Sequence, residues 1–319
     1  TLTTCCLLYN FNGEYINLEM MTINKYIRIL FNCKVRITMM KHFTVLVLFY
    51  LLKSQAVLSE TREPTFKYVT SYNKEGRFMT KDDIEKLSVN VLKPIIFIIG
   101  GLTNTDKKND SWSTDLQDAY LEKLVHNVFI VDWCLPAPPE SSINKAHSAG
   151  LAVADFIATI FNKTEEDYLN IHLVGVSLGC EVAASAAERL RDLSGRKINR
   201  ITGLDPAYYL INDKGEQRKL AAGNADFVDV VHTNLTDICE QIGHADFCVD
   251  DVGINKGPLD DSKPKSVALF ATSVNSNDIK ATKCDNIENF RSGSCNNSER
   301  VTFGENIDIS AKGKYYMKN

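Results

Sequence analysis

The feature that most constrains the fold is a series of short apolar runs, rich in Val and Ile, separated by helical patterns. The runs cover residues 94–99, 127–133, 171–176, 198–204 and 227–231. Because they are apolar without alternation, they are typical of strands buried on both faces of a parallel sheet. Between them, apolar residues recur at helical spacing over 143–161 and 180–190. This order predicts a single α/β domain, with helices on both faces of a mostly parallel sheet.

Two rival classes are excluded by motif and by charge. A doubly wound nucleotide-binding domain requires a glycine-rich phosphate turn after its first strand, and Gly100-Gly101-Leu102 lacks the spacing of that motif. The 319 residues carry a formal net charge of -4 and contain no run rich in Lys or Arg. A nucleic-acid partner is therefore not expected, because the basic surface that would attract phosphates is missing.

Residues 39–59 have the pattern of a secretory signal peptide, with a short basic start, an apolar run and a zone of small residues. The apolar run is about half the ~20 residues that a membrane-spanning helix needs, so we expect export and no transmembrane anchor. Residues 1–38 are interpreted as upstream translation outside the natural product, with a start at Met20 or Met21 as the alternative. The folded domain is expected over residues 60–319 of an extracellular protein.

Cysteines and glycosylation acceptors agree with an oxidising, extracellular compartment. Six cysteines fall within residues 60–319, where some should pair. The close spacings favour Cys284 with Cys295 and, second, Cys239 with Cys248, although the sequence leaves the complete pairing open. Asn-x-Ser/Thr acceptor sites occur at Asn109, Asn162, Asn234 and Asn296.

One motif carries chemistry, namely Gly-Val-Ser-Leu-Gly at residues 175–179. It follows the apolar run 171–176 and leads directly into a helical pattern, which is the context of a nucleophile elbow. The flanking glycines are required because the backbone beside the serine is crowded, and the amide after the serine is one donor of an oxyanion hole. Ser177 is therefore the candidate nucleophile.

Asp205 is the candidate acid, because it follows the next apolar run, 198–204. Consecutive parallel strands bring their carboxyl ends to one edge of a sheet, so Asp205 is expected beside the elbow. In α/β-hydrolases the acid follows the serine in the sequence and the histidine comes last. The alternative role is a turn or cap, since Asp before Pro commonly starts a turn.

Several blocks together resemble the pancreatic lipase family of animal lipases, sn-1 phospholipases and insect yolk proteins. They are Val131-Asp132-Trp133, the elbow, and residues 203–207, 225–233, 243–247 and 313–316. The resemblance spans about residues 90–316 and implies an α/β-hydrolase fold in one domain, without the C-terminal PLAT-type sandwich of the large vertebrate lipases. It implies Ser177 as nucleophile, Asp205 as triad acid, and the backbone amides of Leu102 and Leu178 as the oxyanion hole.

The family's catalytic histidine is missing from its expected position. The block that carries it matches residues 261–266, where Lys263 occupies the histidine position. Only two histidines follow Asp205, His232 and His244, and either is an alternative base if the loops are rearranged. An ion pair between Lys263 and Asp205 is the simpler interpretation, because a nearby carboxylate favours the charged form of a lysine.

Other departures concern metals and the substrate lid. A calcium site carried by some family members would need two aspartates where this chain has Ala221 and Asn224, so we expect no metal and no cofactor. The stretch 248–262 is too short for the cysteine-bounded lid of the triglyceride lipases. We therefore expect a secreted protein with impaired or absent hydrolysis that acts in lipid binding or storage. The alternative is an active extracellular lipase or phospholipase with an unrecognised base; the sequence leaves its oligomeric state open.

Overall fold

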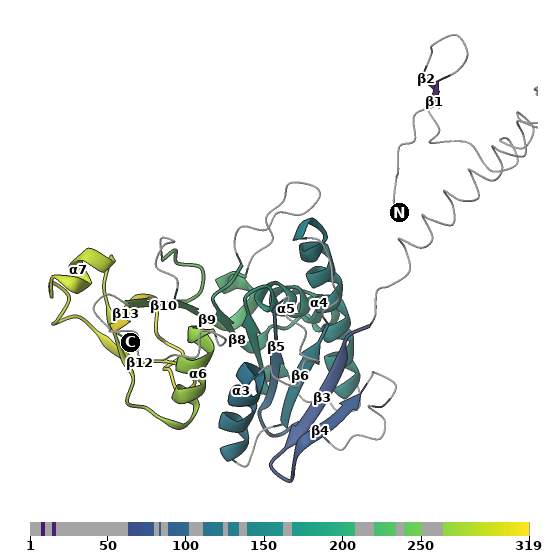
Figure 1. The fold of residues 1–319 in the computed structure, drawn as a ribbon, viewed down its shortest axis with the longest axis horizontal. Coiled ribbons are helices and arrows are strands. Elements are labelled where there is room, and N and C mark those ends of the chain that lie inside the picture. The colour runs from purple at the N-terminus through teal and green to yellow at the C-terminus, as the bar shows by residue number, and fades with distance from the viewer. Residues whose placement is uncertain are drawn as a thin grey trace, which may run out of the picture. The chain divides into compact units, whose positions relative to one another are not determined.

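The structure is a computed structural model (Figure 1), and the chain divides into two compact units, Thr1–Glu60 and Thr61–Asn319. It describes residues 8–9, 15–16, 63–79, 83, 89–101, 111–123, 127–133, 139–161, 168–207, 220–233, 239–250 and 264–318. The described residues of the first unit form the antiparallel pair β1 (Leu8–Tyr9) and β2 (Tyr15–Ile16). The predicted signal peptide, residues 39–59, lies outside the described residues.

The second unit is built on one sheet, in which eleven described strands have the order β12-β11-β13-β10-β9-β8-β7-β5-β6-β3-β4. Their bounds are β3 (Thr65–Thr70), β4 (Asn73–Met79), β5 (Ile95–Ile99), β6 (Asn127–Asp132), β7 (Ile171–Val176), β8 (Ile198–Leu204), β9 (Ala225–His232), β10 (Ala245–Asp250), β11 (Lys280–Lys283), β12 (Arg300–Thr302) and β13 (Gly313–Lys318). The strands from β6 to β13 in this order are parallel, and antiparallel strands flank them on both sides. The predicted mostly parallel sheet is confirmed.

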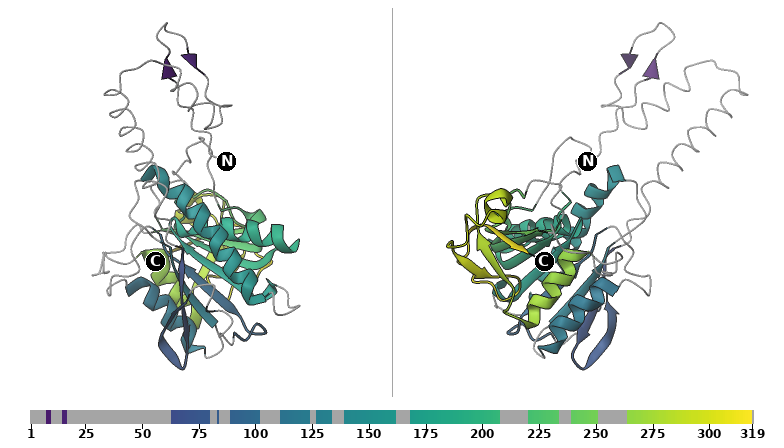
Figure 2. Two further views of the ribbon diagram at one scale, coloured as in Figure 1. Left: turned by 90° about the vertical axis from the view of Figure 1, so that its right-hand side faces the viewer. Right: turned by 60° about the vertical axis from the view of Figure 1, so that its left-hand side comes forward.

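Helices cover both faces of this sheet (Figure 2). Their bounds are α3 (Ser111–Glu122), α4 (Pro139–Phe161), α5 (Gly179–Ser194), α6 (Lys265–Asn275) and α7 (Ile287–Arg291), with short 3-10 turns η2 (Tyr168–Asn170) and η3 (Ala222–Asn224). The helices α4 and α5 pack on one face of the sheet, and α3 and α6 pack on the other. None of the helices described between residues 63 and 318 combines the length and apolarity that crossing a membrane requires. The layers are those of an α/β-hydrolase fold.

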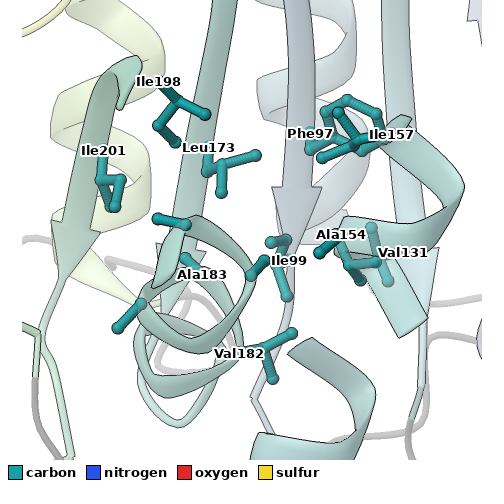
Figure 3. Packing of buried hydrophobic residues seen from close by; sticks show 14 of the residues in the cluster. Phe97, Ile99, Val131, Ala154, Ile157, Leu173, Val182, Ala183, Ile198 and Ile201 are labelled. Atoms are coloured by element: carbon teal, nitrogen blue, oxygen red, sulfur yellow. The ribbon is translucent and has the colours of Figure 1, made fainter. Parts of the chain in front are cut away.

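Strand β5 shows why the central strands are apolar throughout. All five of its residues are buried, and alternate side chains belong to different layers of the core. Phe97 and Ile99 pack with α4 and α5, as Figure 3 shows, whereas Ile98 packs in the layer of α3 and α6. A fully buried Ile or Phe contributes about 1.5–3 kcal/mol relative to an exposed one. Two covered faces therefore require an uninterrupted apolar run, which is the signal that predicted these strands.

The face covered by α3 and α6 also contains a buried polar network. Arg200 on β8 donates hydrogen bonds from both Nε and Nη2 to the carboxylate of Asp229 on β9, at 2.8 and 2.9 Å. Its guanidinium also donates to the carbonyl oxygens of Gly304 and Glu305, at 3.0 and 2.8 Å. The Glu305 carboxylate accepts from Tyr120 of α3 at 2.8 Å and lies 3.4 Å from Nδ1 of His172 on β7. This network fixes the segment after β12 to three central strands.

Acid should weaken the fold through Glu305. Burial opposes ionisation of this carboxyl group, but His172 and Arg200 outweigh it and lower its pKa from 4.5 to about 2. A lowered pKa means that the carboxylate stabilises the fold above about pH 4.5, and that this contribution, of the order of 3 kcal/mol, is lost as the pH falls towards 2. We expect Glu305→Gln to lower the free energy of unfolding at pH 7 and to flatten its dependence on pH over this window. Urea unfolding at a series of pH values measures both effects.

The matched control is Glu299→Gln, because Glu299 is a half-exposed carboxylate paired with Lys283 at 3.0 Å. Such pairs contribute about 0–1 kcal/mol, so this change should leave the pH dependence nearly intact. Equal pH profiles for Glu305→Gln and the unmodified protein would contradict the role given to Glu305.

A disulfide and an ion pair hold the segment around α7, and a second disulfide joins β10 to the residues before it. The disulfides join Cys239 to Cys248 and Cys284 to Cys295, which are the two close pairs that the spacing favours. Arg291 of α7 donates to both oxygens of Asp250 at the end of β10, at 2.8 and 3.1 Å. The Cys284–Cys295 bridge closes the loop that contains α7, and the ion pair ties this helix to the carboxyl end of β10.

Candidate active site

The turn between β7 and α5 has the geometry of a nucleophile elbow. Ser177 has φ of 53°, a left-handed conformation that a residue with a side chain rarely adopts. Its N–H donates to the carbonyl oxygen of Leu204 at 2.9 Å, and its own carbonyl accepts from the N–H of Cys180 at 3.1 Å. The strained serine is therefore held from both sides, at the carboxyl end of the central strand β7.

The flanking glycines are explained by close approach of backbone. A Cβ on Gly175 would lie 2.7 Å from the carbonyl oxygen of Gly179, and a Cβ on Gly179 would collide with the carbonyl oxygen of Ile99. Gly101, just after β5, approaches the serine itself, because a Cβ there would lie 3.5 Å from the Oγ of Ser177. The three glycines allow the end of β5, the serine turn and the first turn of α5 to pack at backbone contact.

The predicted oxyanion donors are described only in part. Leu178 is buried and is the N-terminal cap residue of α5, directly after the serine. Leu102 lies outside the described residues, although Gly100 and Gly101 bring the chain to Ser177 just before it. The assignment of both backbone amides as oxyanion donors stays a prediction.

Asp205 lies at the same edge of the sheet as Ser177, because Val176 of β7 pairs with Leu204 of β8. Among the described residues other than glycine, only Ser177 and Asp205 have a positive φ, and that of Asp205 is 46°. Its carboxylate accepts from the N–H of Thr233 at 2.7 Å and from the Thr233 hydroxyl at 2.6 Å. Both carboxylate oxygens are thus engaged by one residue, Thr233, which the sequence does not identify because it lies 28 positions from Asp205.

A second neighbour of Asp205 is Lys265, to which the sequence pattern gives no role. Lys265 begins α6, where burial lowers the pKa of its ammonium group and the Asp205 carboxylate acts in the opposite direction. A cation therefore lies within electrostatic reach of the candidate acid. Lys263, two residues earlier, lies outside the described residues, so its predicted ion pair with Asp205 stays a prediction.

His232 is engaged by a partner on the side of β9 away from Asp205. Its Nε2 lies 3.0 Å from Oδ1 of Asp246 on β10, and the ring is 8% exposed. The same carboxylate accepts from the N–H groups of Ile242 and Gly243, at 3.1 and 2.9 Å. His232 therefore belongs to a buried cluster that holds the turn before β10, and its strand β9 is separated from β7 and the serine turn by β8.

His244 lies at a different level along the strands from Ser177. Its N–H donates to the carbonyl of Val228 at 2.7 Å, and its Nδ1 accepts from the N–H of Val228 at 3.0 Å. Through β8, Val228 is level with Leu173, four residues before Ser177 in β7. At ~3.3 Å per residue, the ring is about 13 Å from the serine along the strand direction. Burial and the charges of Lys197 and Lys312 also lower its pKa.

The remaining features of the site region concern a thiol, metal ligands and glycosylation acceptors. Cys180 is buried, and burial raises the pKa of its thiol far above the usual range. Asn224 uses both ends of its amide within the protein, since its Oδ1 accepts from the N–H of Ala221 at 2.8 Å and its Nδ2 donates to Glu188 at 3.1 Å. The described residues contain no group of three His, Cys, Asp or Glu side chains that could hold a metal. Asn296 is exposed. The other acceptor sites, Asn109, Asn162 and Asn234, lie outside the described residues.

Comparison with known proteins gives consistent matches. Residues 55–317 match the family model described as Lipase. The chain is 32% identical to lipase member H of Rattus norvegicus over 225 residues, which cover 65% of this chain and 48% of that protein. It is 32% identical to pancreatic lipase-related protein 2 of Homo sapiens, over 52% of this chain and 36% of that protein. It is also 32% identical to lipoprotein lipase of Gallus gallus, over 55% of this chain and 37% of that protein. The chain spans about half the length of the first of these relatives and less of the others.

Proposed function

Because the chain belongs to the pancreatic lipase family, we propose that it is an extracellular protein that binds lipids or lipid esters beside Ser177 and hydrolyses them weakly or not at all. The proposal rests on the elbow geometry at Ser177 together with the loss of the family's general base. A role in lipid binding, storage or carriage follows from that combination.

The observation that carries the proposal is the placement of the two histidines that follow Asp205. His232 contacts the buried carboxylate of Asp246, and His244 accepts a backbone N–H about 13 Å along the strand direction from the serine. An imidazole must reach the serine hydroxyl directly or through one water to act as its base. The pairing of His232 with Asp246, on the side of β9 away from β7, and the position of His244 along the strand support the loss of this base, as does Lys263 at the position that matches the family's histidine.

The charge of Asp205 also disfavours a substitute base. A lysine accepts a proton from serine only when it is neutral, and a nearby carboxylate favours the charged ammonium form. At Lys265 burial lowers the pKa of the ammonium group and the Asp205 carboxylate opposes that lowering, while the oxygens of Asp205 also accept two hydrogen bonds from Thr233. Loss of a triad histidine lowers turnover by about a millionfold in a serine hydrolase, so weak residual turnover is the expected consequence.

An active ester hydrolase is the second candidate, and one observation favours it. Ser177 and Asp205 both keep left-handed backbone conformations. Strain of this kind costs about 1–3 kcal/mol per residue and is typical of functional sites. An active enzyme would require a base that the family pattern does not identify.

The test measures chemistry and binding on the same secreted protein, residues 60–319. We expect slow labelling of Ser177 by a fluorophosphonate and no hydrolysis of a short fluorogenic ester above that of Ser177→Ala. We also expect long-chain fatty acid to raise the thermal midpoint of both proteins, because binding to the native state alone stabilises it.

The matched control is Ser148→Ala, which removes an exposed serine of α4 that donates to the carbonyl of Asn144. It should behave as the unmodified protein in every assay. Prompt labelling of Ser177 together with serine-dependent turnover would overturn the proposal in favour of the active hydrolase. Failure of fatty acid to stabilise either protein would overturn the binding role.

A further inference from the structure

The amino end of helix α6 has no side-chain cap. Pro264 is its N-terminal cap residue, and it supplies no side-chain hydrogen bond to the first turn. The carbonyl oxygen of Pro264 accepts from the N–H groups of Val267 and Ala268, at 3.1 and 3.2 Å. The N–H of Ser266 comes before these two groups, where a helix has no carbonyl of its own to offer. The end of α6 therefore presents a backbone donor together with the positive end of the helix dipole.

Ser266 adds a second donor at the same place. The residue is 0% exposed, and its hydroxyl oxygen Oγ has no hydrogen-bond partner among the residues that the structure describes. A buried hydroxyl without a partner is costly and rare in native proteins, so its presence calls for a physical reason. Because the Cα–Cβ bonds of an α-helix tilt towards its amino end, the side chain of Ser266 leans towards the open start of α6.

Lys265, the first residue of α6, brings a cation to this end of the helix. Lys265 and Pro264 are half-buried, so the helix reaches the surface directly beside the buried serine. The Asp205 carboxylate lies within electrostatic reach of the ammonium group. That carboxylate also accepts the N–H and the hydroxyl of Thr233, at 2.7 and 2.6 Å, so the lysine is not its sole partner. Backbone donor, hydroxyl, helix dipole and cation together form the chemistry that binds an anion.

We propose that the amino end of α6 binds an oxyanion, a carboxylate or a phosphate, through the N–H and hydroxyl of Ser266 and the ammonium group of Lys265. An oxyanion accepts hydrogen bonds from both donors of Ser266, whereas a cation or an apolar group would leave them without partners. The inference rests on the proposed lipid binding for its natural ligand, which would be a lipid with an ionised head group. A free phosphate ion has the same chemistry, and the experiment separates the two sources.

The first measurement uses the unmodified protein and ligands that differ in the head group. Octanoate and 1-octanol have chains of the same length, but only octanoate is charged at pH 7. We expect octanoate to move the amide NMR resonance of Ser266 in a saturable way, and octanol to leave it in place. Inorganic phosphate at constant ionic strength should move the same resonance. Tighter binding of octanoate than of phosphate would identify the lipid head group, and the reverse would identify the free ion. If neither anion moves the resonance, the proposal is overturned.

Ser266→Ala gives a signature that a purely structural serine would not give. Without ligand, the thermal midpoint of the variant should lie about 2–4 °C above that of the unmodified protein, because an unpaired buried hydroxyl is removed. Its affinity for octanoate and for phosphate should nevertheless fall at least about tenfold, the loss expected for a hydrogen bond to a charged group. Unchanged affinity for both anions would overturn the proposal.

The matched control is Ser273→Ala, because Ser273 lies on the same helix and is also 0% exposed. Its hydroxyl donates to the carbonyl oxygen of Phe270 at 2.6 Å and accepts from the N–H of Glu305 at 3.0 Å. This change should lower the thermal midpoint and leave the affinity for the anions as it is. If Ser266→Ala lowers the midpoint as Ser273→Ala does, the Ser266 hydroxyl is a structural donor and the proposal is overturned.

Failure of this site and failure of lipid binding give different results. If long-chain fatty acid stabilises the protein while octanoate and octanol act alike on Ser266, the lipid binds without this site and the proposal is overturned. If phosphate binds at Ser266 while fatty acid gives no stabilisation, the oxyanion site stands and the lipid-binding role fails. The measurements on the unmodified protein give this answer even if a variant does not fold.

Discussion

Replacing Lys263 by histidine should raise the hydrolysis of short fluorogenic esters by about 10²–10⁴-fold, the range that a positioned general base contributes. The expectation rests on the elbow and on Asp205, which lie at the ends of the adjacent strands β7 and β8. The family pattern has its triad histidine at this position, and a histidine at residue 263 would restore it. Steady-state kinetics of the purified protein measure the gain.

Two further variants separate the supply of a base from the removal of a charge. Lys263→Gln removes the ammonium group without providing a base, and it should stay at the level of the unmodified protein. Lys263→His combined with Ser177→Ala should lose the gained activity. A gain in the glutamine variant equal to that in the histidine variant would show that the lysine charge, and not the missing imidazole, suppresses hydrolysis.

Arg200→Met should lower the free energy of unfolding by about 3–5 kcal/mol, the cost of leaving one partner of a buried ion pair without the other. The side chain of Asp229 is fully buried, and Arg200 supplies two of the hydrogen bonds to its carboxylate. Thr202 supplies a third at 2.9 Å, which a lone carboxylate would retain. Chemical denaturation at pH 7 provides the measurement.

Arg300→Met is the matched control, because Arg300 is an exposed arginine on the edge strand β12. Surface substitutions usually change stability by no more than about 0.5 kcal/mol. A loss in Arg200→Met no larger than in this control would mean that the Arg200 pair contributes no net stability. The double variant Arg200→Met with Asp229→Leu tests the origin of the loss, since removing both charges should recover much of it.

The sequence predicted the part of the fold whose burial leaves a simple pattern. The five apolar runs correspond to β5, β6, β7, β8 and β9, and the two helical patterns correspond to α4 and α5. The apolar pattern does not predict strand β10, because Asp246 and Asp250 interrupt it. In the structure these two carboxylates are buried against His232 and Arg291. Charged residues inside a strand are explained only by partners on other strands and helices, which the local sequence does not reveal.

The candidate site likewise contains residues that the sequence predicts and residues that it does not. The elbow and Asp205 could be found because strand, turn and helix are contiguous in sequence and because consecutive parallel strands end at one edge. Thr233 could not be assigned a role, since its hydrogen bonds join residues 28 positions apart in the chain. Such pairings depend on the order of strands in the sheet, which apolar runs do not specify. Leu102, Lys263 and most of the glycosylation sites lie outside the described residues, so their roles stay predictions.

The position of β13 has a consequence for how this fold forms during synthesis. Strand β13 lies between β10 and β11 in the sheet, although residues 313–318 are translated after both. Until those residues leave the ribosome, β10 and β11 each present an unpaired row of backbone groups. Exposed strand edges of this kind attract other chains. The facing edges of β10 and β11 are therefore covered only once residues 313–318 have joined the sheet, and a chain interrupted shortly before residue 313 would leave both edges exposed.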